Sequence, residues 1–121
     1  LHSCGFVREI IPDWIETGVN ILQFDQPEIH GIDYLAEHFG GQVHIESPVD
    51  IQTTLQTQDH DRIASAARDY IDKLAAPYDG GFIAGYYGSN PALGLEPEFQ
   101  ETASQVFQEH GQSPWRQGVA A

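Results

Sequence analysis

The chain has little positive charge, one cysteine, no methionine and no long apolar run. Five Lys and Arg residues stand against 18 Asp and Glu, which gives a formal net charge of −13. Because nucleic acids and anionic membranes are bound through clustered Lys and Arg, this balance disfavours both as partners. The single cysteine, Cys4, excludes an internal disulfide and fits a reducing compartment, so we expect a cytoplasmic protein. No segment approaches the roughly 20 apolar residues that a membrane-spanning helix needs.

What the chain does have is enough apolar material for one domain. Its 121 residues are 40% hydrophobic and 11% aromatic, which suffices to build a core. The first residue is Leu1, and the stretch from Leu1 to Gly5 lacks the apolar strand that should precede it. We therefore expect this chain to be a fragment of a larger domain.

Apolar periodicity predicts the secondary structure. Helical spacing predicts helices over residues 6–17, 27–39, 61–75 and 96–111, and a polar tail follows residue 111. Short apolar runs predict strands over residues 19–24, 42–46 and 82–87, and residues 1–5 are interpreted as the end of a strand. Residues 47–59 and 88–95 are predicted loops, the first with room for one helical turn.

Strands that alternate with helices predict right-handed βαβ units and a parallel sheet. Four such units are half of a (β/α)₈ barrel, or TIM barrel, which needs roughly 250 residues when complete. We therefore predict the C-terminal half of a TIM barrel. An open doubly wound sheet is the alternative, although no Gly-x-Gly-x-x-Gly follows any predicted strand, so its dinucleotide-binding version is disfavoured.

The strongest site candidate is the pair His2 and Cys4. Residues two apart in extended backbone point to the same side, so an imidazole and a thiol face a common position. Zinc takes nitrogen and sulfur ligands, and a catalytic zinc keeps three protein ligands and one open position. The pair is therefore half of a possible zinc site, although a His-x-Cys triplet alone more often reflects ordinary packing.

Other candidates follow from the barrel geometry, in which the active site forms at the C-terminal ends of the strands. The residues at those positions are Asp25, Glu46, Asp50, Tyr86 and Tyr87. We select Asp25, Asp50 and Tyr87 as candidate catalytic groups. The alternatives are an N-cap role for Asp25, a solvated rim for Glu46 and Asp50, and only one tyrosine on the inner side of the barrel. His44 lies within a predicted strand and is interpreted as a packing or surface residue.

Several motifs in order resemble a known family. They are His2-Ser3-Cys4-Gly5, Ile10-Ile11-Pro12, Glu16-Thr17-Gly18-Val19-Asn20, Val49-Asp50-Ile51-Gln52, Gly80-Gly81-Phe82-Ile83 and the closing Glu-Pro helix. Together they resemble the C-terminal half of the uroporphyrinogen decarboxylase-like superfamily, and they are most similar to its methylcobamide:thiol methyltransferase branch. The resemblance covers residues 1 to about 111 and implies a TIM barrel.

The resemblance also implies a metal site. In the methyltransferase branch the His-x-Cys-Gly motif supplies two zinc ligands, which correspond to His2 and Cys4, and Asp25 matches an acid at the metal. The family's further cysteine follows the Gly-Gly-Phe-Ile strand. This chain has Tyr86-Tyr87-Gly88-Ser89-Asn90 there, without a cysteine.

The implied activity is transfer of a methyl group from a methylated corrinoid, carried by a partner protein, to a zinc-bound thiol. One alternative is decarboxylation of a tetrapyrrole, but the arginine-rich motif of that enzyme belongs to the other half of the barrel. Its relatives also carry a Gly-His-Gly-type loop where this chain has Tyr87-Gly88-Ser89. Another alternative is a non-catalytic barrel that has kept the fold and lost the site.

Overall fold

The computed structural model describes residues 1–112, and residues 113–121, which contain the predicted polar tail, lie outside the described part. The strands are β1 (His2–Ser3), β2 (Ile21–Phe24), β3 (His44–Ser47) and β4 (Phe82–Ala84). The helices are α1 (Ile11–Glu16), α2 (Ile32–Phe39), α3 (His60–Leu74), α4 (Asn90–Leu93) and α5 (Glu98–His110). Short 3₁₀ turns are η1 (Pro27–Ile29), η2 (Leu55–Thr57) and η3 (Ala76–Tyr78). None of the helices within residues 1–112 is both long and apolar enough to cross a membrane.

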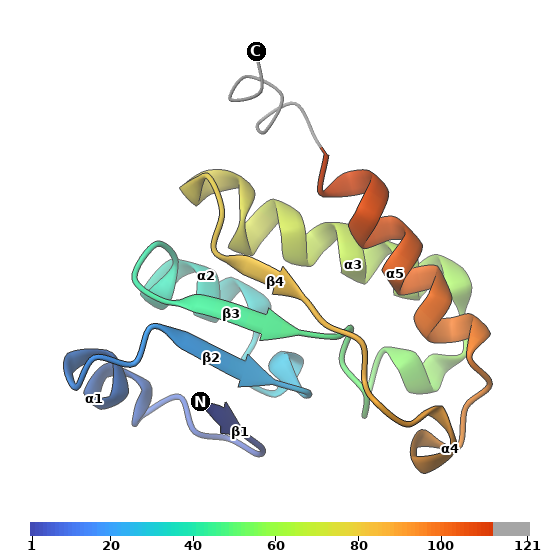
Figure 1. Cartoon of the computed structure of the whole chain (residues 1–121), viewed down its shortest axis with the longest axis horizontal. Coiled ribbons are helices and arrows are strands. Elements are labelled where there is room, and N and C mark those ends of the chain that lie inside the picture. Colours follow the sequence, from blue (N-terminus) through green and yellow to red (C-terminus); the bar gives the residue numbers. More distant parts are fainter. Residues whose placement is uncertain (113–121) are drawn as a thin grey trace.

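The four strands form one parallel sheet in the order β1-β2-β3-β4, as Figure 1 shows. Strand neighbours in the sheet are therefore neighbours in the chain. A doubly wound sheet reverses its strand order at a switch point, and these four described strands contain no such reversal. The predicted α/β class with a parallel sheet is confirmed.

Helices cover one face of this sheet. Leu22, Phe24 and Ile45 are at most 2% exposed, and the α3 stripe from Ile63 to Leu74 packs in the same core. In Figure 1 the helices α2 and α3 lie behind the sheet, and α5 runs beside α3. The predicted apolar stripes of α3 and α5 are buried, which confirms those two helices.

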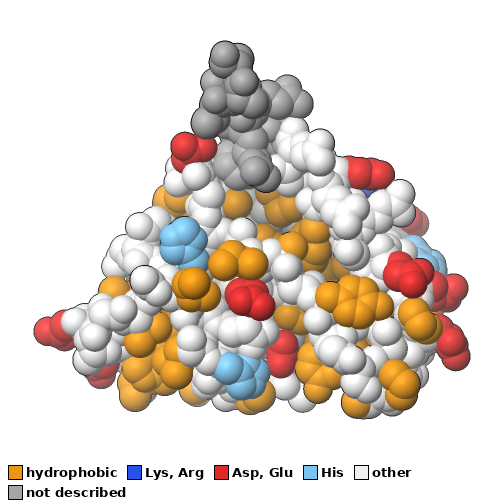
Figure 2. All heavy atoms as spheres, in the orientation of Figure 1, with side chains coloured by type: hydrophobic (Ala, Val, Ile, Leu, Met, Phe, Trp, Pro, Cys, Tyr) orange, Lys and Arg blue, Asp and Glu red, His pale blue; other side chains and the backbone are white. Residues whose placement is uncertain are grey.

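No element within residues 1–112 covers the opposite face of the sheet, which we call the uncovered face. The register aligns His2, Gln23, Glu46 and Ile83 in one row across the four strands. Ile83 is 39% exposed, and Ile21, on the same face of β2, is 40% exposed. Figure 2 shows this face, where hydrophobic, acidic and histidine side chains are interspersed. Parallel sheets are normally covered on both faces, so this face is unusual for a parallel sheet.

We expect the 121-residue chain to self-associate in solution. The outer edges of β1 and β4 have no neighbouring strand among the described residues, and unpaired edges are templates for pairing with other chains. The uncovered face adds exposed isoleucine side chains that association would bury. Light scattering coupled to size exclusion should report a mass above that of one chain. A monodisperse monomer at micromolar concentration would contradict this expectation.

The first predicted helix is wrong in its first half. Residues 6–17 were expected to be helical, but α1 begins only at Ile11, with Pro12 in its first turn, where the missing N–H of proline costs nothing. Phe6 and Ile10 are 53% and 43% exposed, so the apolar spacing before the proline does not mark a buried helical face. Gly18 has φ +101° just after the helix, as the predicted C-cap requires.

Other parts of the secondary structure also differ from the prediction. The helix expected over 27–39 is divided into η1 and α2 by Gly31, whose φ of +83° is incompatible with a continuous helix. The strand expected to reach Tyr87 ends at Ala84. The loop expected over 88–95 contains α4, whose N-cap Ser89 accepts a hydrogen bond from the backbone N–H of Ala92.

Candidate functional site

His2 and Cys4 lie together at the carboxyl end of β1. His2 Nε2 is 3.2 Å from Cys4 Sγ, so the two side chains point to a common position, as their spacing predicts. Both residues are exposed, and Gly5 follows with φ +79°, which turns the chain away from the sheet. On its other side the His2 ring contacts Gln23, because Nδ1 is hydrogen-bonded to the Gln23 side-chain oxygen.

Asp25 is joined to this pair through Gln23. The Gln23 side-chain nitrogen donates to Asp25 Oδ1 at 2.9 Å. The result is a chain of contacts from Cys4 through His2 and Gln23 to Asp25, across the carboxyl ends of two adjacent strands. Three of the predicted site residues are therefore connected by one residue that the prediction did not include.

A concave surface adjoins this chain of contacts, and we call it the strand-end pocket. It has a volume of about 570 Å³, within the usual size of small-molecule sites. Its lining residues are Cys4, Asp25, Gln26, Ile51, Gln52, Gln56, Tyr87, Ala92 and Leu93. It therefore contains predicted candidates from the ends of β1 and β2 and from the segment after β4, as a barrel active site would.

Asp25 does not cap the helical segment that follows it. The residue at the N-cap of η1 is Gln26, which makes no side-chain capping bond, and the backbone N–H of Glu28 donates to Asp50 instead. The Asp25 backbone oxygen accepts from the N–H of Ile51 at 3.1 Å, which ties the end of β2 to the loop after β3. The carboxylate of Asp25 thus remains at the pocket.

Asp50 anchors a loop. Its side chain is 1% exposed and accepts backbone N–H bonds from Glu28, Gln52 and Thr53 at 2.9–3.0 Å. Its own N–H donates to the Tyr70 hydroxyl at 3.1 Å. These three bonds occupy the carboxylate. The geometry therefore favours a structural role for Asp50, which holds the loop carrying Ile51 and Gln52 to the pocket.

Tyr70 completes this buried network. Its hydroxyl donates to Glu28 Oε2 at 2.7 Å, and Thr54 donates to the same carboxylate oxygen. Burial, and then the neighbouring Glu28 carboxylate, raise the pKa of Tyr70 far above its ordinary value. The phenol therefore stays protonated and acts as a hydrogen-bond donor throughout the physiological range.

The two tyrosines after β4 have different surroundings. Tyr87 is half-buried, packs against the core and lines the strand-end pocket. Tyr86 is 48% exposed, and its hydroxyl accepts from the Asn90 side chain. Gln100 of α5, 2% exposed, fixes this segment by accepting from the Tyr87 N–H and donating to the Tyr87 carbonyl. Of the two tyrosines, Tyr87 therefore lines the strand-end pocket.

The remaining two predicted positions, Glu46 and His44, lie on the uncovered face of the sheet. Glu46 is half-buried and stands beside Gln23 in the row across the sheet. His44 begins β3 and is exposed, which agrees with its interpretation as a surface residue.

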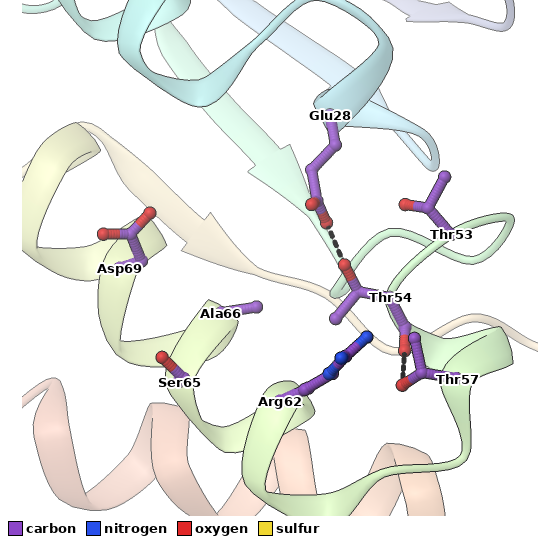
Figure 3. Close-up of a pocket in the computed structure, with 8 residues that line it drawn as sticks. All are labelled: Glu28, Thr53, Thr54, Thr57, Arg62, Ser65, Ala66 and Asp69. Atoms are coloured by element: carbon purple, nitrogen blue, oxygen red, sulfur yellow. Dashed lines mark hydrogen bonds between the residues drawn. The ribbon is translucent and has the colours of Figure 1, made fainter.

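A second hollow lies on the helical side of the sheet (Figure 3). It has a volume of about 500 Å³ and lies between α3 and the segments around Glu28 and residues 53–57. Two of its three threonine hydroxyls are used internally, since Thr54 donates to Glu28 and Thr57 donates to the Thr54 carbonyl. Arg62 pairs with Asp59 at 3.6 Å. The strand-end pocket, which is lined by the Cys4 thiol and the Asp25 carboxylate and adjoins the His2 imidazole through its contact with Cys4, therefore remains the better candidate.

Sequence reasoning missed Gln23 and Gln100. Gln23 carries a signal, because it is the only polar residue in the apolar run Ile21–Phe24 and alternation places it on the face opposite Leu22 and Phe24. Gln100 lies next to the buried stripe of α5, but nothing in its spacing indicates which loop it contacts.

The metal ligands are only partly assembled. Within residues 1–112 no three His, Cys, Asp and Glu side chains are grouped closely enough to form a ready metal site. Nitrogen and sulfur ligands on one tetrahedral zinc ion would be about 3.6 Å apart, given usual bond lengths. The His2 Nε2 and Cys4 Sγ atoms, 3.2 Å apart, are close to that spacing, so these two residues fit zinc.

Comparison with known proteins gives no match: no family profile, no curated protein and no solved structure is similar to this chain.

Proposed function

We propose that this chain is the C-terminal half of a uroporphyrinogen decarboxylase-like TIM barrel of the methyltransferase branch. Three observations support the barrel: the strands are parallel, they follow chain order, and helices cover only one face. In a closed barrel the other face lines the interior, where the row from His2 to Ile83 would be covered by the missing strands. The candidate residues gather at the carboxyl ends of the strands, where barrel enzymes have their sites.

The proposed cofactor is zinc, held by His2 and Cys4 with Asp25 as the third protein ligand. The 3.2 Å separation between His2 Nε2 and Cys4 Sγ is the observation that carries this proposal. Asp25 is partly buried at the same pocket, and its carboxylate is linked to His2 through Gln23. Three ligands would leave one position for an exogenous thiol.

The proposed reaction is methyl transfer from a methylated corrinoid, carried by a partner protein, to a small-molecule thiol. A bound zinc ion would favour the thiolate, which is the nucleophilic form of the acceptor. With the methylated corrinoid as the donor substrate, the thiolate electron pair would form the new carbon–sulfur bond, and the pair of the broken cobalt–carbon bond would stay with the corrinoid. Ile51, Tyr87 and Leu93 supply an apolar wall for the acceptor, and the thiol proton would be released to water when the metal binds the thiolate.

Tetrapyrrole decarboxylation is the alternative reaction. Uroporphyrin-type substrates carry several carboxylates, which proteins usually bind through arginine or lysine. The residues that line the strand-end pocket include no Lys or Arg. This half of the site therefore favours the methyltransferase proposal.

Zinc content tests the proposal. We expect the purified chain to bind about one zinc ion, and His2→Ala and Cys4→Ser to lose it, because a site with one nitrogen or sulfur ligand fewer holds zinc poorly. His44→Ala is the matched control, since His44 is exposed on the same sheet but lies outside the pocket. Elemental analysis after dialysis, without chelator, gives the stoichiometry. Absence of zinc in the wild-type chain would refute the proposal and leave a non-catalytic barrel or a tetrapyrrole enzyme.

A further inference from the structure

Gln23 occupies the centre of the candidate site although it is neither acid, base nor metal ligand. It lies in β2, with His2 beside it on β1 and Glu46 beside it on β3, on the uncovered face of the sheet. Its side chain is half-buried and contacts both His2 and Asp25.

The orientation of the Gln23 amide is determined by its nitrogen. That nitrogen donates to Asp25 Oδ1 at 2.9 Å and to the Phe24 carbonyl at 3.3 Å, so both of its hydrogens have acceptors. The reversed amide would place its oxygen against a carboxylate and a carbonyl, which is repulsive. The Gln23 oxygen therefore faces His2 Nδ1, and it can only accept a hydrogen bond.

An acceptor at Nδ1 determines the tautomer of His2. A neutral imidazole has one N–H, and the Gln23 oxygen draws it to Nδ1. The lone pair then lies on Nε2, the atom 3.2 Å from Cys4 Sγ. A histidine that ligates a metal characteristically donates its other ring N–H to an oxygen in this way.

We propose that Gln23 is a positioning residue, which holds His2 as the Nδ1–H tautomer and turns Nε2 toward the metal position beside Cys4. The metal part of this inference rests on the proposed zinc site, whereas the tautomer does not. Gln23 also restrains Asp25, so one amide orients two of the three proposed ligands.

The tautomer can be measured without metal. Two-bond ¹H–¹⁵N spectra of the metal-free chain at about pH 8.5, two units above the ordinary histidine pKa, should show His2 protonated at Nδ1. In Gln23→Leu, which removes the acceptor, the signal should change to the Nε2–H form. Gln105→Leu is the control, because Gln105 is exposed on α5 and its side chain donates to Glu109, far from His2 in the sequence. An Nε2–H tautomer in the wild-type chain, or no change in Gln23→Leu, would overturn the inference.

Zinc affinity gives the second measurement. Loss of such an outer partner characteristically weakens metal binding by about 10- to 100-fold, and we expect that loss in Gln23→Leu but not in Gln105→Leu. Equal affinities in wild type and Gln23→Leu would refute the role of Gln23 and leave the zinc proposal intact. If the wild-type chain binds no zinc, the proposed function fails, and the tautomer comparison still decides whether Gln23 orients His2.

Discussion

Replacing Asp50 by alanine is expected to lower the free energy of unfolding by about 3 kcal/mol, because its buried carboxylate accepts three hydrogen bonds, and bonds to a charged group contribute about 1.5–3 kcal/mol each, part of which water would replace at the exposed residues Gln52 and Thr53. The carboxylate accepts from the N–H groups of Glu28, Gln52 and Thr53, and an alanine accepts none of these bonds. The three donors come from two separate segments, so their loss also releases the loop from η1. The loop carries Ile51 and Gln52, and the strand-end pocket should lose its shape with it.

Urea unfolding followed by circular dichroism measures this effect. Asp50→Asn should be intermediate, because its single carbonyl oxygen can retain the bonds from Gln52 and Thr53, which share Oδ1, or the one from Glu28. Asp33→Asn is the control, since Asp33 is an exposed partner of Lys73 and surface ion pairs contribute about 0–1 kcal/mol. A loss below about 0.5 kcal/mol in Asp50→Ala would show that the network does not hold the loop.

His30 is expected to make the stability depend on pH. It is 2% exposed between the rings of Phe6 and Phe24, and neither ring nitrogen has a hydrogen-bond partner among the described residues. Burial, and then the Arg8 charge, lower the pKa of His30 below its ordinary value. Because the unfolded chain then binds more protons, the free energy of unfolding should fall as pH drops below about 6.5, by at most about 1.4 kcal/mol per pH unit.

Replacing His30 by leucine should remove this dependence. It should also raise stability near neutral pH by about 1 kcal/mol, because two buried polar atoms without partners disappear. Urea unfolding is to be measured from pH 7.5 to 5. The difference in the free energy of unfolding between wild type and His30→Leu isolates the contribution of the His30 imidazole. His44→Leu is the control, since His44 is exposed. Parallel pH profiles for wild type and His30→Leu would contradict the account.

The helices that the sequence predicted well are those whose apolar residues keep helical spacing over several turns. In α3 and α5 the stripes end in Leu74 and Phe107, and both residues are buried as expected. The failures come where one local feature overrides the spacing. Pro12 can begin a helix but not lie inside one, and Gly31, with positive φ, separates η1 from α2. Apolar periodicity alone does not show where a proline or a glycine interrupts a helix.

The site was predictable where strand alternation or strand ends decide it. The spacing of His2 and Cys4 predicted their common orientation, and the end of β2 placed Asp25 at the pocket. The burial of Asp50 was not predictable, because its three donors lie on two segments whose contact depends on the tertiary fold. The pairing of Gln100 with Tyr87 is likewise a contact between an α5 residue and a loop. No pattern of residue spacing in the sequence indicates such a contact.

Cobalt substitution tests most directly the proposal that Cys4 Sγ and His2 Nε2 bind one metal ion. Co²⁺ added to the chain should give a sulfur-to-cobalt charge-transfer band in the near ultraviolet and visible bands typical of tetrahedral coordination. Cys4→Ser should lose the charge-transfer band, His2→Ala should weaken binding, and excess Zn²⁺ should displace the cobalt. A wild-type chain that shows no charge-transfer band at saturating Co²⁺ would contradict the account.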